Sequence, residues 1–524
     1  MLKFQVFENG TPAASWPLRN AYLLGSDSSA IRCDMRFDRE RGLILCEKRE
    51  SGAAALALQH SVGECGQLTL QTCLLPERDE PYILNLELAR HRLMMLYNKL
   101  EDWQMFELSP DHAVMKRVEA ARRVFVEALC LQTTDPAASD QLAQQCLVTS
   151  VDGSEELALA HAELLLTRRK AGATMPRHPL GTGVHIDAGH DRLRQAIIGT
   201  FDFVNLPINW RQTVPVEGEY KWGPLDAWVE WCGKHRLPIT AGPLVSFDPA
   251  DIPDWLYIWE HDYDTVRDVI YEHVEKVVSR YRNVINGWNV VSGLHVNSHF
   301  AFSFDQLMDL TRMTTMLVKK IQPAAKAIIE VRQPFGEYYA QNARSIPPMM
   351  YGDLIVQNAI TFDALGVRLL MGQAMPGQHV RDLMQVSNLL DAMAVFSKPL
   401  HLTVAAPSEP VTAAMLTVPD GGEAADPDCG VWRKPWSGLV QSRWMEAVMQ
   451  VAMSKPFIEA VAWQDLVDHP AMEMPLGGLI AEDLQPKAAL KRLVNFRRSL
   501  LSVGGSGARA VAAAARTTSA GEHI

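Results

Sequence analysis

The sequence predicts a (β/α)8 barrel that follows an all-β module and a helical connector. Three observations lead to this prediction. Strand-like apolar runs alternate with helical patterns from about residue 175 onward, the first 80 residues show only short strand patterns, and the segment between them has helical spacing. We expect an N-terminal β module at 1–80, a connector at 81–174, the barrel at 175–501 and a disordered tail at 502–524.

The N-terminal segment has the pattern of a small sandwich or jelly roll. Its short apolar runs, such as Leu2–Val6 and Gln67–Leu75, are separated by Asn-Gly, Ser-rich and Gly-rich turns. Runs of this length between turn residues are typical of antiparallel strands. A module of this kind can bind sugar, but packing against its neighbours is the simpler interpretation.

The connector is expected to consist of three helices. Apolar residues recur at helical spacing from Ile83 to Leu100, and further helices are expected at about Pro110–Leu131 and Ser154–Arg169. We interpret the stripe of Leu and Met as packed core.

The barrel prediction depends on eight strand candidates that alternate with helices. The candidate strands are 180–186, 201–206, 239–247, 287–291, 327–331, 364–370, 400–405 and 459–463. The helical segments include 222–235, 263–281, 304–321, 379–396, 440–453 and 486–501. Eight alternating strands are the number that a (β/α)8 barrel requires, and loops after its strands carry the chemistry. We therefore look for functional residues directly after the strands.

The composition argues against several classes of partner and cofactor. The net charge of -11 disfavours general binding to nucleic acid or anionic membranes. The eight cysteines are scattered without a C-x-x-C pair, so neither a disulfide framework nor a thiolate zinc site is expected. No Gly-rich phosphate loop follows a strand, and we expect no cofactor. Without a visible signal peptide or an apolar run of about 18 residues, the sequence favours a cytoplasmic location.

Four segments of the barrel region carry a family resemblance. They are F-D-F-V-N-L-P-I-N-W with E-Y-K-W-G-P-L-D-A-W-V-E-W (201–231), I-T-A-G-P-L-V-S-F with I-P-D-W (239–255), R-Y-R-N-V-I-N-G-W-N-V-V-S-G (280–293), and V-A-W-Q-D-L-V-D with Q-P-K-A-A-L (461–490). In this order they resemble glycoside hydrolase family 10, the endo-β-1,4-xylanase-type barrels. The resemblance covers about residues 175–500, and it implies a (β/α)8 barrel that acts on a β-1,4-linked glycan.

The chain departs from this family at both catalytic positions. The resemblance places the acid/base glutamate at Gly293 and the nucleophilic glutamate at Val404. The family's third-strand histidine falls on Gly242 or Pro243, and its second-strand lysine on Asn209. Retaining hydrolysis needs two carboxyl groups about 5 Å apart. Because glycine and valine supply neither, the usual mechanism does not carry over with the fold.

Carboxylates elsewhere at the barrel mouth are candidates for a displaced catalytic pair. We select Glu409, in the loop after the seventh strand, and Asp465, after the eighth. A loop carboxylate can act as acid or base when burial raises its pKa. Solvated or ion-paired acids are the simpler interpretation. His295 and His299 have an i, i+4 spacing, but without an H-E-x-x-H pattern we expect hydrogen-bonded histidines and no metal.

Tryptophans near the strand ends suggest sugar binding, since aromatic rings stack on the apolar faces of pyranoses. Trp432 and Trp436, in a Gly/Pro-rich insert, form the expected exposed pair, whereas Trp288 is equally compatible with the core. By the resemblance, Trp463 lies under the subsite nearest cleavage. The candidate ligand-binding residues are Asn209, Trp210, Trp288, His295, Trp432, Trp436, Trp463 and Gln464.

Two functions remain compatible with the sequence. The first is a xylanase-like pseudoenzyme that binds a β-1,4-linked glycan or oligosaccharide in the barrel-mouth cleft without retaining hydrolysis. The alternative is an active glycoside hydrolase of polysaccharide catabolism that uses relocated carboxylates. A non-sugar polar ligand in the same cleft is a third possibility.

Overall fold

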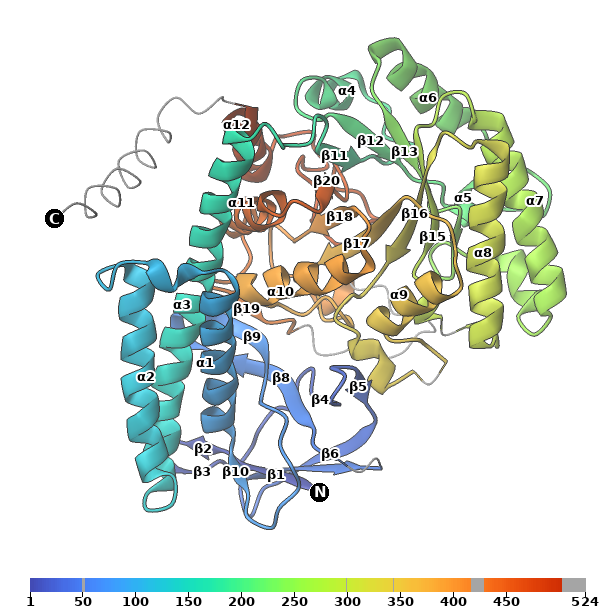
Figure 1. The fold of residues 1–524 in the computed structure, drawn as a ribbon. Coiled ribbons are helices and arrows are strands. Elements are labelled where there is room, and N and C mark those ends of the chain that lie inside the picture. Colours follow the sequence, from blue (N-terminus) through green and yellow to red (C-terminus); the bar gives the residue numbers. More distant parts are fainter. Residues whose placement is uncertain (50–51, 298, 343, 416–427, 502–524) are drawn as a thin grey trace.

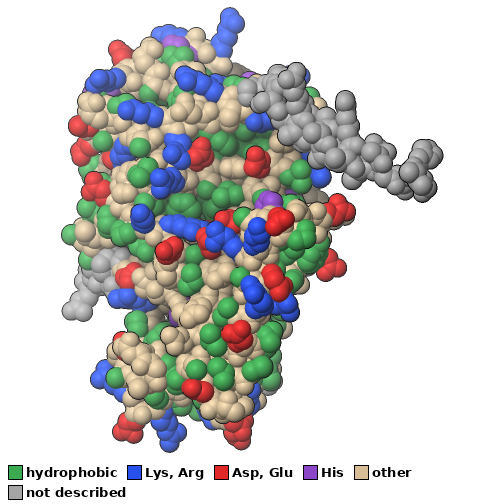
Figure 2. Space-filling view, turned by 90° about the vertical axis from the view of Figure 1, so that its left-hand side faces the viewer, with side chains coloured by type: hydrophobic (Ala, Val, Ile, Leu, Met, Phe, Trp, Pro, Cys, Tyr) green, Lys and Arg blue, Asp and Glu red, His purple; other side chains and the backbone are tan. Residues whose placement is uncertain are grey.

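The structure, a computed structural model, has three parts that pack together (Figure 1). It describes residues 1–49, 52–297, 299–342, 344–415 and 428–501. A β-rich lobe, drawn in blue, lies below the barrel, and three long helices run along one side of the lobe; the longest of them continues along the barrel. The expected tail at 502–524 lies outside the described residues. Acidic and basic side chains are mixed over the face shown in Figure 2, where the β-rich lobe forms the narrower end.

The predicted (β/α)8 barrel is confirmed. Its strands pair in parallel in the order β13-β12-β11-β20-β18-β17-β16-β15-β14, and a further pairing of β13 with β15 closes the ring. The strands are β11 (Leu180–Gly183), β12 (Phe203–Leu206), β13 (Ile239–Ala241), β14 (Val245–Ser246), β15 (Gly287–Ser292), β16 (Lys326–Val331), β17 (Ala364–Leu370), β18 (Leu400–Ala405) and β20 (Ile458–Trp463). Buried apolar side chains dominate these strands, as expected for a parallel sheet covered on its outer face.

The third barrel strand differs from the single run expected at 239–247. Gly242 and Pro243 separate β13 from β14, and proline cannot donate to a strand ladder. Gly242 has φ +135°, and a Cβ there would lie 2.3 Å from the carbonyl oxygen of Asn289. β14 still pairs with β15, which brings Ser246 beside Ser292 at the carboxyl ends of the strands.

Helices surround the barrel (Figure 1). They are α4 (Asp191–Ile197), α5 (Trp210–Thr213), α6 (Gly223–His235), α7 (Tyr263–Tyr281), α8 (Phe304–Ile321), α9 (Pro348–Gln357), α10 (Leu383–Met393), α11 (Gly438–Ser454) and α12 (Ala488–Leu501). Several begin at polar N-caps; Ser303, for example, forms a capping box with Gln306 at the start of α8. Within the described part of the chain, no helix has the length and apolar character needed to cross a membrane.

The N-terminal lobe contains two main sheets. The four-stranded sheet has the order β10-β1-β7-β6, and the five-stranded sheet has the order β19-β9-β8-β4-β5. Their strands are β1 (Leu2–Gln5), β4 (Tyr22–Leu24), β5 (Ala30–Ile31), β6 (Cys33–Asp38), β7 (Leu43–Lys48), β8 (Ala55–Ser61), β9 (Gly66–Gln71), β10 (Tyr82–Ile83) and β19 (Val431–Trp432), beside a small ribbon of β2 (Phe7–Glu8) and β3 (Thr11–Pro12). β19 comes from the loop after barrel strand β18, so the barrel supplies the last strand of an N-terminal sheet.

The connector consists of α1 (Leu84–Asp102), α2 (Ala113–Leu131) and α3 (Pro136–Ala171). α3 begins well before Ser154, where the apolar pattern placed its start. Asp135 caps the helix by accepting a hydrogen bond from the backbone of Ala138, and Pro136 occupies the first turn. The early start therefore had a local signal in the sequence, which the weak apolar periodicity of this region concealed.

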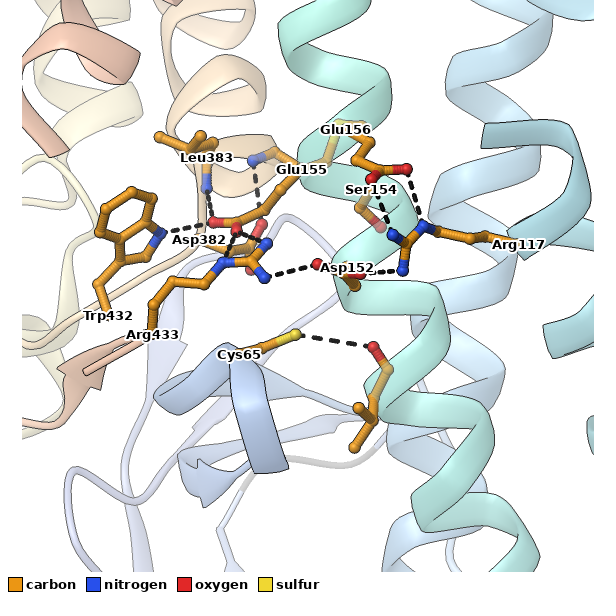
Figure 3. Close-up of polar contacts among 12 residues, drawn as sticks. Cys65, Arg117, Asp152, Ser154, Glu155, Glu156, Asp382, Leu383, Trp432 and Arg433 are labelled. Atoms are coloured by element: carbon orange, nitrogen blue, oxygen red, sulfur yellow. Dashed lines mark hydrogen bonds and ion pairs between the residues drawn. The ribbon is translucent and has the colours of Figure 1, made fainter. Parts of the chain in front are cut away.

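Buried polar contacts join α3 to the barrel (Figure 3). Glu155 accepts hydrogen bonds from the indole Nε1 of Trp432 at 2.7 Å and from the backbone of Leu383 at 3.1 Å. Arg433 contacts Glu155 at 2.5 Å and Asp152 at 2.6 Å. Burial raises the pKa of Glu155, and the Arg433 charge opposes this shift. These contacts anchor β19 and the start of α10 to one helix.

A second polar junction attaches the N-terminal lobe to the loops after β16 and β17. Arg381 pairs with Glu337 and donates to the hydroxyl of Tyr22 at 3.0 Å. Asn20 also donates to Glu337, at 2.9 Å. Burial raises the pKa of Tyr22 to about 12. The lobe therefore contacts the carboxyl-terminal side of the barrel, where the candidate site lies.

Candidate functional site

A network of charged side chains lies at the carboxyl ends of the barrel strands. Glu330 and Arg368 are within β16 and β17, and Arg332 follows β16 directly. The remaining members come from loops. We call the whole set the mouth network; it comprises Asp248, Asp251, Glu330, Arg332, Arg368 and Glu473. Charges in otherwise apolar strands are costly unless they are paired, and each member here has an opposite partner.

Arg332 binds three carboxylates. Its Nη2 atom lies 2.7 Å from Asp248 Oδ2 and 2.7 Å from Glu473 Oε1, while its Nη1 lies 3.9 Å from Asp251. Burial alone would lower the pKa of Arg332, but Glu473, Asp248 and the other network acids outweigh burial and raise it. Arg332 is therefore a permanent cation with an exposed side-chain fraction of 11%.

Arg368 forms the second cationic centre. Its Nε lies 3.0 Å from Glu330 Oε1, and its Nη1 lies 2.8 Å from Glu473 Oε2. The Ser292 hydroxyl also donates to Glu330, at 2.5 Å. Burial would raise the pKa of Glu330, yet Arg368 and Ser292 reverse that effect and lower it. Glu473 thus joins the two arginines, with one carboxylate oxygen on each.

Asp251 is the network acid with the raised pKa. Burial, reinforced by the negative charge of Asp248, moves the pKa of Asp251 from 3.8 to about 6, although Arg332 opposes the shift. Asn209 donates to Asp251 Oδ1 at 2.8 Å and so holds the carboxyl group in place. A carboxyl group that titrates near pH 6 is suited to general acid or base chemistry.

We expect Asp251 to make stability depend on pH. Between about pH 4 and pH 6 the folded protein keeps a proton on Asp251 that the unfolded chain releases, so the free energy of unfolding falls as the pH rises through this window. Asp251→Asn should remove this dependence. Its free energy of unfolding should exceed that of the wild type by about 1–3 kcal/mol at pH 7 and equal it near pH 4. Urea denaturation across this range tests the prediction. Asp254→Asn, at a position 76% exposed on the same segment, is the control.

The two positions that the resemblance assigns to catalytic glutamates lie on either side of this network without contributing a carboxylate. Gly293 has φ +66°, and a Cβ there would lie 2.7 Å from Arg332 Cδ. Val404 is fully buried in β18. A glutamate at position 293 would therefore have to displace the Arg332 side chain.

The expected exposure of Trp432 and Trp436 is wrong, because these side chains are 8% and 4% exposed. Trp432 donates to Glu155 in the contact with α3, and Trp436 packs edge-on against Trp444 at 6.2 Å. The Gly/Pro-rich composition suggested a surface loop, but Trp432 lies in β19, which pairs with the N-terminal sheet.

The other predicted aromatic contacts are also buried. Trp288 donates to Gln322, which precedes β16 at the amino end of the barrel, so its ring lies away from the mouth. Trp463 is fully buried and donates to the carbonyl oxygen of Gly477 at 2.8 Å. Trp210 stacks on His273 of α7, with ring centroids 4.5 Å apart. These three rings pack in the core and present no open face for a sugar to stack on.

His295 contacts the mouth network through the backbone of Arg332. The side chain is fully buried, its Nε2 donates to the backbone carbonyl of Arg332 at 2.9 Å, and its ring stacks on Tyr351. Burial lowers the pKa of His295 to about 4, so the ring is neutral near pH 7. Within the described residues, no group of three or more His, Cys, Asp or Glu side chains is arranged to hold a metal ion.

Two predicted binding residues, Asn209 and Gln464, do contact the mouth network. Asn209 holds Asp251, and Gln464 donates to Glu473 Oε2 at 3.3 Å. The predicted acids lie differently. Glu409 is exposed beside Ser408, and Asp465 is 16% exposed and faces His469 at 3.5 Å.

None of the six residues of the mouth network was selected as a site residue from the sequence. A signal existed for two of them, because Arg368 interrupts a strand of apolar residues and Arg332 ends another. Glu473 had no local signal, since it lies in an irregular loop ten residues after β20. Only the closed ring brings these positions together.

A separate cavity of about 460 Å³ lies where the N-terminal lobe, the connector and the barrel loops meet. Its wall includes Leu24, Met95 and Phe335, one from each part, together with the buried Arg381. It shares no lining residue with the mouth network, so the two locations are distinct.

Part of the barrel is similar to glycoside hydrolase family 10, and Gly293 and Val404 supply no carboxylate at the two positions that the resemblance assigns to glutamates. The model of glycosyl hydrolase family 10 matches residues 199–306. The chain is 30% identical over 82 residues to endo-1,4-beta-xylanase A of Xylanibacter ruminicola and 26% identical over 113 residues to endo-1,4-beta-xylanase B of Humicola insolens. These matches cover 15% and 21% of this chain, and only 22% and 31% of the relatives.

A solved structure similar in shape is xylanase 10B from Thermotoga petrophila in complex with xylobiose. It has 13% sequence identity and a TM-score of 0.45, and the alignment covers 64% of this chain and 97% of that chain.

Proposed function

We propose that this protein binds a β-1,4-linked glycan or oligosaccharide at the barrel mouth and does not hydrolyse it by the retaining mechanism. The observation that carries the proposal is the Arg332–Arg368 pair, which lies with its acidic partners at the carboxyl ends of the strands. Gly293 and Val404 supply no carboxylate there. The match of residues 199–306 to the family model supports a sugar as the ligand.

Polar side chains at the mouth supply the hydrogen-bonding groups that a sugar requires. The amide oxygen of Gln464 is buried without a hydrogen-bond partner, as is that of Gln333, which directly follows Arg332. Buried polar atoms are almost always paired, so these two acceptors suit the hydroxyl donors of a ligand or water. Because the predicted tryptophans are buried, recognition at this site depends on hydrogen bonds more than on ring stacking.

The alternative, an active hydrolase, is favoured by the pKa of Asp251. Its carboxyl group titrates near pH 6, as a general acid should, and Asp248 and Glu473 lie close by. Asp248 Oδ2 and Glu473 Oε1 each lie 2.7 Å from the same Arg332 nitrogen, so the distance between these two oxygens cannot exceed twice that value. That spacing is short enough for a retaining pair. However, Arg332 binds both carboxylates, which weakens either as a nucleophile.

Binding and turnover can be measured on the same samples. We expect saturable calorimetric binding of xylohexaose or cellohexaose and no shorter products after a long incubation. Products that disappear in Asp251→Asn but persist in Asp254→Asn would establish the hydrolase with Asp251 as its acid. Glu409→Gln and Asp465→Asn test the two acids selected from the sequence. Absence of both binding and products would contradict both proposals.

A further inference from the structure

The carboxylate of Glu473 is held by four side-chain donors. Arg332 and Arg368 each bind one of its oxygens, at 2.7 and 2.8 Å. Gln378 donates to Oε1 at 3.4 Å, and Gln464 donates to Oε2 at 3.3 Å. Guanidinium groups that converge on the two oxygens of one carboxylate form a strong and geometrically specific carboxylate site.

Three of the four donors lie in or directly after barrel strands, whereas Gln378 and the Glu473 carboxylate come from loops. Arg332 and Arg368 belong to the adjacent strands β16 and β17 or their ends, and Gln464 follows β20 directly. Glu473 lies in the segment between β20 and α12, in which no helix is present. The exposed side-chain fractions are 11% for Arg332, 16% for Arg368 and 24% for Glu473. Glu473 is thus the most exposed of the three side chains.

We propose that the four donors Arg332, Arg368, Gln378 and Gln464, which we call the cradle, form a subsite for the carboxylate of an acidic sugar, a hexuronate unit of the glycan. Glu473 occupies this subsite until such a ligand binds. This inference rests on the proposed function and names the class of glycan. Exchange of the Glu473 carboxylate for that of a hexuronate leaves the net charge of the mouth unchanged, so no additional buried charge has to be compensated. A phosphate dianion would add negative charge beside Asp248, Asp251 and Glu330, and it fits less well.

The groups beside the cradle match the remainder of a sugar. Gln373 donates to the backbone carbonyl of Glu473 at 3.0 Å, which holds the main chain of the loop while the side chain can still rotate away. When Glu473 leaves, the amides of Gln378 and Gln464 lose an acceptor, and ring hydroxyls or the incoming carboxylate replace it. The unpaired oxygen of Gln464 adds an acceptor for a hydroxyl donor.

Removal of Glu473 should therefore strengthen the binding of acidic sugars. The two probes are a xylotriose that carries one glucuronate side unit and the same compound with its carboxyl group reduced to an alcohol. In Glu473→Ala, which removes the internal competitor, we expect the acid form to bind about tenfold more tightly than in the wild type. The reduced form should change little. Glu482→Ala, at an exposed position of the same loop, is the matched control.

Calorimetry on the full chain separates the outcomes. Equal affinity of Glu473→Ala for the acid and reduced probes overturns the carboxylate subsite but leaves glycan binding intact. Binding of free glucuronate by Glu473→Ala, without binding of either oligosaccharide, supports the subsite and contradicts the glycan proposal. Absence of binding in every titration overturns both. Arg368→Lys keeps the positive charge opposite Glu330, and we expect this variant to bind the acid and the reduced probe with equal affinity. If it still binds the acid probe more tightly, the proposed cradle is contradicted.

Discussion

Replacing Arg92 with methionine is expected to lower the free energy of unfolding by about 3–5 kcal/mol, because a buried charge loses its partner. Arg92 of α1 and Asp382 are 3% and 0% exposed, and their two hydrogen bonds measure 3.1 and 2.6 Å. Asp382 also caps α10 by accepting hydrogen bonds from the backbone of Met384 and Gln385. Without Arg92, the Asp382 carboxylate loses the cation that binds both of its oxygens. The shift in the urea midpoint measures the effect.

A second substitution distinguishes an unpaired charge from lost packing. Asparagine at position 382 still accepts the capping hydrogen bonds but carries no charge. The double variant Arg92→Met/Asp382→Asn should therefore be more stable than Arg92→Met alone. If its loss equals or exceeds that of the single variant, the explanation by charge is wrong. Arg122→Met, which breaks an exposed pair with Glu119 on α2, should leave the midpoint unchanged.

Replacing Gly66 with alanine should detach β19 from the N-terminal sheet. Gly66 has φ +104°, and a Cβ there would lie 2.1 Å from the carbonyl oxygen of Val431 and 2.7 Å from the backbone nitrogen of Arg433. These are backbone atoms, so rotation of a side chain cannot relieve the clash. We expect a loss of about 2–4 kcal/mol in the free energy of unfolding. Hydrogen exchange at residues 428–433 should accelerate.

Gly52→Ala is the matched control for backbone strain. Gly52 has φ +117°, close to that of Gly66, but nothing lies within 4 Å of a Cβ built there. It therefore reports the conformational cost alone, whereas Gly66→Ala adds the clash with β19. Equal losses in the two variants would show that the β9–β19 contact contributes nothing to stability.

The barrel could be predicted from the sequence because its signals are local. Each strand is a short apolar run, each is followed by a helical pattern, and the positions agree closely with β11 to β18 and β20. The third strand was expected to be continuous, and Gly242-Pro243 was the signal for its interruption. β19 was missed because a two-residue strand has no periodicity, and its partner β9 lies in a distant part of the chain.

The site could be predicted only in part. Asn209 and Gln464, which were selected as ligand-binding residues, do contact the mouth network, and the resemblance identified Gly293 and Val404 as positions without a carboxylate. The tryptophans were misjudged because composition does not show what covers a ring. Trp432, for example, is buried by a sheet and a helix from the first third of the chain. The mouth network depends on the spatial meeting of Asp248, Arg332 and Glu473, which no local pattern encodes.

The pairing of β19 with the N-terminal sheet affects the order in which parts of the protein can fold during synthesis. Gly66 and Gln67 emerge from the ribosome long before their partners Trp432 and Val431. Until then, β9 has an unpaired edge whose N–H and C=O groups can pair with any extended chain nearby. Nascent chains on one messenger are close neighbours, so premature termination or slow translation after β9 should favour aggregation. Completion of the first lobe is thus one of the last steps of folding.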